Sequence, residues 1–140
     1  MNTDAATIMQ QAATRGASQR NLVRAAAAAV RAVLPAVKTR GYFVRKAISA
    51  SELWAKDPCE LNQRAAQWAG LSLRWRVLGV SAGSRKYDPR DDLAVFAAYF
   101  LAVSTHNGAS DMAILAVTLA DGAAARLDVD LAPIVTAQFL

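Results

Sequence analysis

Cysteine and histidine are scarce in this chain of 140 residues, which contains one of each, Cys59 and His106. A single cysteine excludes a disulfide within the chain, and two such side chains are too few for a structural zinc site. The sequence therefore predicts no metal ion and no other cofactor. The missing disulfides also favour a reducing compartment, so we expect the protein in the cytoplasm or in a virion.

Long apolar runs are missing as well. No apolar segment is long enough to span a bilayer, and the N-terminus lacks the charged start and unbroken apolar region of a signal peptide. We therefore expect no membrane partner. The length favours one domain, because a chain of this size can bury roughly two thirds of its surface around a single core.

Acidic residues are almost absent from the first third of the chain. Residues 1–46 contain eight Lys and Arg against the single acid Asp4, whereas residues 47–140 contain eight basic and ten acidic residues. The net charge of +5 is thus divided into +7 and −2. This asymmetry indicates either a polyanionic partner for the first third or a head-to-tail contact between copies of the chain.

The clearest single element is a helix in the second half of the sequence. Asp88 can cap it, Pro89 fits its first turn, and Gly108 supplies a left-handed stop. Between these ends, residues 93–103 carry no polar group except the Tyr99 hydroxyl. Because a helix that is apolar on every side must be covered on every side, we predict a buried central helix.

Other segments show patterns typical of strands. An alternation of apolar and polar residues indicates half-buried strands, and aromatic or β-branched runs favour strands too. Between two of these segments, Asp121-Gly122 is a strong β-hairpin signal. The predicted strands are residues 41–48, 71–80, 112–119 and 125–131.

Together these elements predict an α+β fold, in which helices pack on a small, mainly antiparallel sheet that ends in a C-terminal β-hairpin. Residues 1–140 form a single domain. Within it, residues 1–40 are helical and basic, with a first short helix from Asp4 to about Thr14 and Ser18 as the cap of the second helix, and residues 41–140 hold the sheet and the buried central helix.

The second predicted helix, which begins at Ser18 and is interrupted by Pro35, has three faces at about 100° per residue. One face is broadly apolar and is expected to point to the core. A second face is a basic stripe, and a third is an alanine row that either lets another helix approach closely or reflects high helix propensity alone. The basic stripe is Arg20, Arg24, Arg31 and Lys38, and the alanine row is Ala25, Ala28, Ala29, Ala32 and Ala36.

The basic stripe allows three interpretations. It is followed by the aromatic residues Tyr42 and Phe43, and cations that meet phosphates beside rings that stack on bases suit a nucleic acid. It also suits an acidic protein surface. The third interpretation is a solvated face without a partner, and no nucleic-acid motif in the sequence decides among them.

Three patterns suggest catalysis or nucleotide binding, and each is incomplete. Gly79-Val80-Ser81-Ala82-Gly83 resembles the nucleophile elbow of α/β-hydrolases, but the next helix does not start directly after the serine. Cys59 begins a helix and His106 could pair with it, yet acids flank the thiol. The loop Gly83-Ser84-Arg85-Lys86 lacks the ending of a P-loop. We therefore predict that the protein is not an enzyme.

The last ten residues carry no charged side chain and end in Phe139-Leu140, which favours their burial against another surface. With the basic stripe and with Ala25, Ala28 and Ala32, these two residues are the predicted interaction residues. We expect a non-catalytic subunit of a homo-oligomeric assembly, whose partners are further copies and neighbouring subunits. In size and alanine content the chain is similar to small head–tail and tail components of bacteriophage virions. The alternative is a nucleic-acid-binding accessory protein that uses the basic N-terminal helix.

Overall fold

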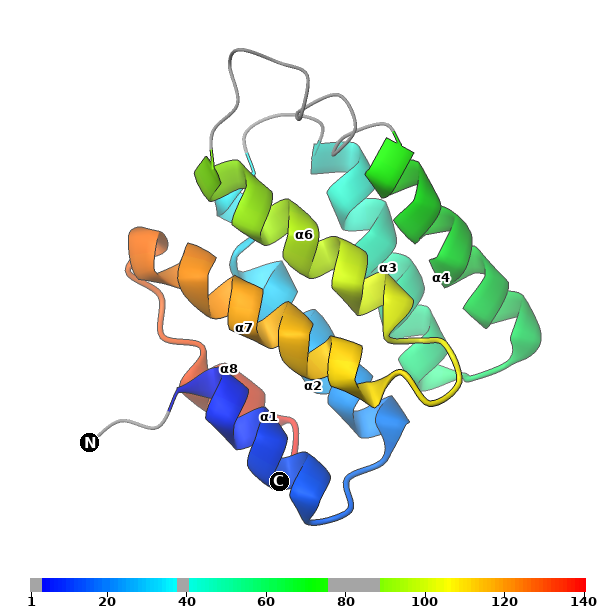
Figure 1. Ribbon diagram of the computed structural model, residues 1–140, viewed down its shortest axis with the longest axis horizontal. Coiled ribbons are helices and arrows are strands. Elements are labelled where there is room, and N and C mark those ends of the chain that lie inside the picture. The colour runs from blue at the N-terminus through cyan, green and yellow to red at the C-terminus, as the bar shows by residue number, and fades with distance from the viewer. Residues whose placement is uncertain (1–3, 38–40, 76–88) are drawn as a thin grey trace.

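A computed structural model describes residues 4–37, 41–75 and 89–140 of the chain, and all regular secondary structure in these residues is helical (Figure 1). The chain forms one helical domain, so the α+β prediction is wrong. The helices are α1 (Ala5–Thr14), α2 (Gln19–Ala32), the short 3-10 helix η1 (Leu34–Ala36), α3 (Gly41–Lys56), α4 (Glu60–Leu73), α6 (Pro89–Val103), α7 (Ser110–Leu127) and α8 (Ala132–Ala137).

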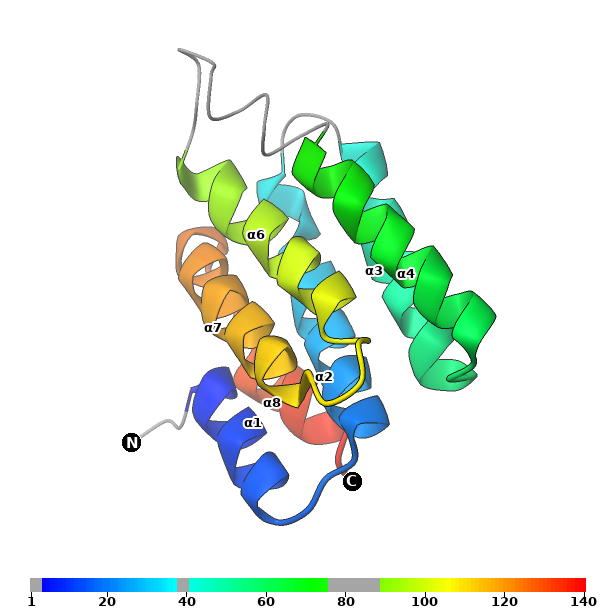
Figure 2. The same cartoon turned by 45° about the vertical axis from the view of Figure 1, so that its right-hand side comes forward.

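The helices pack side by side around one core. Helices α6 and α7 lie next to each other in the middle, and α2 packs against α3 on one side and α7 on the other (Figures 1 and 2). Helices α1 and α8 cover one end of this group. Helix α4 lies at the opposite edge, where it packs on α3 and α6, so one of its faces points away from the molecule.

The predicted first helix and the predicted Ser18 cap of the second helix are confirmed. The Asp4 carboxylate accepts a hydrogen bond from the Thr7 amide at 2.8 Å, and the Ser18 hydroxyl accepts one from the Asn21 amide at 3.1 Å. Each side chain thereby satisfies one of the free amides of a first helical turn. Helix α2 ends at Ala32, and Pro35 lies in η1, as expected for a residue that cannot continue an α-helix.

The first two predicted strands are wrong. Residues 41–48 begin α3, whose buried residues recur at helical spacing, namely Val44, Ala47, Ile48, Ser51, Trp54 and Ala55. Residues 71–73 complete α4, and residues 76–80 lie outside the described residues. The alternation of Leu71, Leu73 and Trp75 does not mark one face of a strand, because Leu73 is buried while Leu71 and Trp75 are exposed.

The predicted C-terminal β-hairpin is also wrong, because α7 runs unbroken through Asp121-Gly122. A Cβ atom added at Gly122 would lie 3.2 Å from Leu93 Cδ1, so this glycine provides space for a packed side chain instead of a turn. Asp121 accepts a hydrogen bond from the Ala6 amide at 3.2 Å and thereby helps to cap α1. The chain turns after α7 at Asp128, whose φ of 57° is left-handed.

The central helix is confirmed in position but not in complete burial. Helix α6 contacts α7, α3, α4 and α2, and its residues Ala97, Ala98 and Leu101 are fully buried. Phe96, however, is 37% exposed. The helix is therefore central without being covered on every side.

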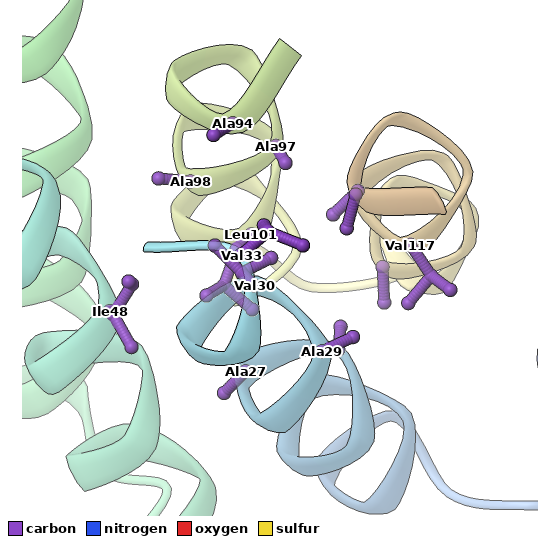
Figure 3. Close-up of a cluster of buried hydrophobic side chains, with 14 of the residues drawn as sticks. Ala27, Ala29, Val30, Val33, Ile48, Ala94, Ala97, Ala98, Leu101 and Val117 are labelled. Atoms are coloured by element: carbon purple, nitrogen blue, oxygen red, sulfur yellow. The ribbon is translucent and has the colours of Figure 1, made fainter. Parts of the chain in front are cut away.

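Alanine accounts for 19 of the 33 buried apolar residues in the described part of the chain. Small side chains allow neighbouring helices to approach closely, and the larger ones fill the spaces between them. In Figure 3, Leu101 of α6 points toward Val30 of α2 and Val33 just after it, with Ala94, Ala97 and Ala98 above Leu101.

The alanine row belongs to this internal packing. Ala25, Ala29 and Ala36 are buried within the chain, and Ala28 and Ala32 are partly buried. The expectation that alanine faces another helix therefore holds inside the molecule. A contact of Ala25, Ala28 and Ala32 with a second copy stays a prediction.

Candidate protein interaction surface

The largest exposed apolar side chains lie on the outward face of α4. Trp68 is 69% exposed and Leu61 is 76% exposed, and Trp75, just beyond the end of α4, is 74% exposed. Leu71 lies beside them and is also exposed. We call these four residues the α4 surface. Tryptophan is highly buried in most folded chains, so two exposed tryptophans on one helical line mark a surface that is suited to contact with another molecule.

Close packing of α4 on α6 explains why these side chains point outward. The inner face of α4 consists of Ala66, Ala69, Gly70 and Leu73. A Cβ atom added at Gly70 would lie 3.0 Å from the Ala102 Cβ atom of α6, closer than ordinary van der Waals contact. Indole rings have no room on that side. The helical spacing of Leu61, Ala65 and Trp68 in the sequence predicts that they form the buried side of this helix, but this prediction is wrong, since all three are exposed.

The spacing of the α4 surface is that of a helix-to-helix contact. Leu61, Trp68 and Trp75 are separated by seven residues each, and Leu71 follows Trp68 by three. A repeat of seven with an added position at three produces the narrow apolar line of a coiled-coil seam. Large apolar residues fill this line except between Leu61 and Trp68, where Arg64 takes the added position.

Charge on this surface is nearly balanced. The Arg64 guanidinium lies 2.7 Å from the Glu60 carboxylate, one turn earlier on the same helix. Both side chains are mostly exposed, so the pair stabilises α4 by only about 0.3–0.5 kcal/mol. The more important effect of the pair is that Arg64, the cation within the apolar line, has a counterion on its own helix.

A small hollow deepens the surface beside Leu71. It has a volume of about 160 Å³ and is lined by α4 and α6 residues and by His106. The Gln67 amide nitrogen lies 3.4 Å from His106 Nδ1 at its rim. Such a volume is close to the roughly 150 Å³ that holds one aromatic ring in an engineered apolar cavity. The lining residues are Gln67, Gly70, Leu71, Tyr99, Ala102, Val103 and His106.

The structure places three residues of the basic stripe in contacts within the chain. Arg20 donates from Nε to the Ala55 carbonyl and from Nη2 to the Lys56 carbonyl at 2.7 Å, which caps the end of α3. Arg24 donates to the Gln138 carbonyl after α8 at 3.0 Å. Lys38 lies outside the described residues. Arg20 and Arg24 therefore neutralise the negative ends of two neighbouring helices.

Arg31 forms the third contact of the stripe. Its guanidinium donates two hydrogen bonds to the Glu52 carboxylate of α3, at 2.9 and 2.6 Å. These hydrogen bonds raise the pKa of Arg31 above its ordinary value. The ion pair is bidentate, but the Arg31 and Glu52 side chains are both about 40% exposed, so it contributes little to the free energy of unfolding. Its main effect is to hold α2 and α3 in one relative position.

The predicted C-terminal residues lie at a second concave region. A groove of about 580 Å³ lies between α1, the start of α2 and the last residues, and Arg15, Arg24, Phe139 and Leu140 are among its lining residues. Phe139 packs partly against the core, whereas Leu140 is fully exposed. Phe139 is thus partly covered within the chain, and burial of Leu140 against another surface stays a prediction.

Of the residues considered for catalysis, the structure describes Cys59 and His106. Cys59 is an exposed N-cap of α4 without a side-chain capping bond, and no group of three or more His, Cys, Asp or Glu among the described residues is placed to hold a metal ion. The hydrolase-like segment 79–83 and the loop 83–86 lie outside the described residues.

No protein-family model, no curated protein and no solved structure matches this chain. Among the described residues, no helix is long and apolar enough to cross a membrane. The function is therefore inferred from the α4 surface, which sequence reasoning missed. The signal that could have found it is the seven-residue spacing of Leu61, Trp68 and Trp75. The alternation of apolar and polar residues around Leu73 suggested a strand and drew attention away from this spacing.

Proposed function

We propose that the protein is a non-catalytic subunit of a homo-oligomeric assembly and that the α4 surface is where its copies associate. The observation that carries this proposal is the exposure of Trp68 and Trp75 on one line of an edge helix. Trp side chains each bury about 150–250 Å² when they are covered, so these two alone offer a few hundred square ångströms of apolar area. That is comparable to the largest apolar patches of monomeric proteins, of about 300–600 Å², which are often functional.

The internal contacts of the basic stripe favour protein association over nucleic-acid binding. Phosphate recognition uses cations that are free to replace counterions. Here Arg20, Arg24 and Arg31 each donate to a carbonyl or carboxylate of the chain itself. Binding of nucleic acid through Arg20, Arg24, Arg31 and Lys38 stays a prediction, and the experiment below includes it as an outcome.

The proposal is tested by sedimentation velocity of the full chain over a hundredfold range of concentration. We expect the wild type to sediment as a reversible oligomer at the upper end of the range. The variant Trp68→Ser/Trp75→Ser should sediment as a monomer, because Trp anchors contribute most of the binding free energy in many interfaces. Its circular dichroism should remain helical, since neither side chain belongs to the core.

The matched control is Tyr42→Ser/Leu53→Ser, which removes two exposed apolar side chains from α3. It should associate like the wild type. A wild-type chain that is monomeric at every concentration would overturn the proposal, and so would a tryptophan variant that associates as strongly as the wild type. Strong, salt-sensitive binding of a DNA or RNA oligonucleotide by a monomeric chain would favour the nucleic-acid alternative instead.

A further inference from the structure

The α4 surface has a symmetry that limits how a second copy can bind to it. Leu61 and Trp75 lie seven residues on either side of Trp68. Reversing the direction of the helix about Trp68 therefore places one large apolar residue over another at all three positions. A surface that matches its own reversed copy suits a twofold interface, in which both subunits use the same patch.

The charges near α4 distinguish the two possible directions. Asp57 and Glu60 lie at its start, and Arg74 is the residue that follows its last turn. In a parallel pair, the Arg74 side chains of the two copies would lie at the same end of the interface, as would the Glu60 side chains, so each end would carry charges of one sign. An antiparallel pair instead brings each acidic start near a basic end. It also aligns the helix dipoles favourably, because each positive N-terminus then lies beside a negative C-terminus.

We propose that two copies pair antiparallel along α4, with the twofold axis beside Trp68. Trp68 then packs against its own copy at the axis, and Leu61 of each copy packs against Trp75 of the second copy. Arg74 lies near Glu60 of the second copy at both ends. This proposal rests on the proposed function, since it specifies the partner and the direction of the association through the α4 surface.

A stable pair along α4 needs a polar rim around the apolar line. Helix α4 has 14 residues and is therefore about 21 Å long at 1.5 Å per residue. Stable interfaces bury about 800 Å² per partner, with an apolar centre and a polar rim. The α4 surface provides the apolar centre. Gln67, beside the apolar line, and the hollow next to Leu71 belong to a rim that a second copy can cover.

The native cysteine allows a direct measurement of the direction. Cys59 is the single cysteine of the chain, is exposed, and lies nine residues before Trp68. In the antiparallel pair the two Cys59 residues are about 27 Å apart along the helix axes, whereas in a parallel pair they are separated only by the interhelical distance of about 10 Å. Spin labels on Cys59 of the wild-type chain, measured by double electron–electron resonance, should therefore give a distance of about 30 Å.

A second label position checks the axis. In the variant Cys59→Ser/Ala65→Cys the label lies three residues from Trp68, so the antiparallel pair predicts a much shorter distance, with about 9 Å along the axes. A parallel pair predicts short distances for both labels. A short distance for Cys59 in a chain that does associate would overturn the antiparallel pairing and would leave the proposed self-association standing. A monomeric chain would overturn both.

Charge exchange provides an independent test. Arg74→Glu should weaken association by about tenfold or more, because it places like charges together at both ends of the pair. Adding Glu60→Arg to the same chain should restore most of the affinity. Arg126→Glu, an equal charge change on the exposed side of α7, is the control and should change the affinity little. A double variant that binds no better than Arg74→Glu alone would contradict the proposed contact of Arg74 with Glu60.

Discussion

Helices α2 and α4 both contain 14 residues, and both combine arginine with large apolar side chains, but they use these residues in opposite ways. Helix α2 lies between other helices and buries Leu22, Val23 and Val30. Helix α4 lies at the edge, buries mainly alanine and glycine, and exposes Leu61 and both of its nearby tryptophans. Where a neighbouring helix approaches very closely, small residues form the buried face. The position of large apolar residues then does not identify that face.

The arginines differ in the same way. Arg20 of α2 reaches two carbonyls at the end of α3, so it connects separate elements. Arg64 of α4 is paired with Glu60 of its own helix and is largely exposed. The difference shows that a stripe of cations on a helix can serve the fold itself when helix C-termini lie within reach. Three pairs of substitutions test this contrast, and a fourth pair tests the opposite end of the molecule.

The largest effect is expected from shortening matched leucines. Leu22→Ala should lower the free energy of unfolding by about 2–5 kcal/mol, because the side chain is 1% exposed and its removal leaves a cavity. Leu61→Ala should change it by no more than about 0.5 kcal/mol, as for most surface positions. Chemical denaturation at a concentration where the chain is monomeric measures both. Equal losses would show that the outer face of α4 is covered within a single chain.

A glycine pair tests the close approach of α4. Gly122→Ala should stabilise the chain by about 0.5–1 kcal/mol, because alanine favours the helix and the neighbouring Leu93 side chain can shift. Gly70→Ala gains the same helix propensity, but its new methyl meets Ala102 Cβ, and overpacking costs about 1–3 kcal/mol. Thermal unfolding should therefore place Gly70→Ala below Gly122→Ala. The reverse order would contradict the account of why the tryptophans point outward.

A smaller difference is expected between the two kinds of arginine. Arg20→Ala removes two hydrogen bonds to the end of α3 and should cost about 1 kcal/mol. Arg64→Ala removes an exposed pair within one helix and should cost about 0.3–0.5 kcal/mol. Urea denaturation of the two variants under identical conditions compares them. If Arg20→Ala unfolds like the wild type, the contacts of the basic stripe do not hold α3, and the solvated-face interpretation regains support.

The smallest effect concerns pH and the end of the molecule farthest from α4. Burial raises the pKa of Asp121, and the negative charges of the nearby Asp4 and Asp130 raise it further. The hydrogen bond from the Ala6 amide lowers this pKa but does not cancel the increase. A group whose pKa is raised in the folded state contributes stability below its unfolded pKa of about 3.9, and this contribution is lost as pH rises through the folded value. The wild type should therefore lose stability relative to Asp121→Asn between acidic and neutral pH.

Asp4→Asn is the control with the opposite sign. The hydrogen bonds with Thr7 lower the pKa of Asp4, so its contribution is present at neutral pH and is lost as pH falls through the folded value. Urea denaturation of the wild type and both variants across this pH range measures the differences. Sedimentation should show that neither variant changes self-association. Parallel pH profiles for Asp121→Asn and Asp4→Asn would contradict the assigned environment of Asp121.

The sequence predicted well those features that depend on neighbouring residues. Ser18 caps α2, Pro35 lies in the 3-10 turn that follows α2, and Gly108 has the expected left-handed φ of 75°, although α6 ends earlier, at Val103. The strands failed for a common reason. An alternation over a few residues also occurs by chance on a helix. Asp121-Gly122 did not form a turn, because Gly122 lies within α7 where the Leu93 side chain packs against it.

By itself, the sequence determined the start of α2 at Ser18, its interruption before Pro35 and its three faces, since capping, proline geometry and helical periodicity are local properties of the chain. Tertiary structure decided which faces are covered. Whether Arg20 meets a phosphate or the end of α3 depends on where α3 lies, and whether Trp68 is inside or outside depends on how closely Gly70 approaches Ala102. These distances arise from the packing of residues far apart in the chain, and no local pattern contains them.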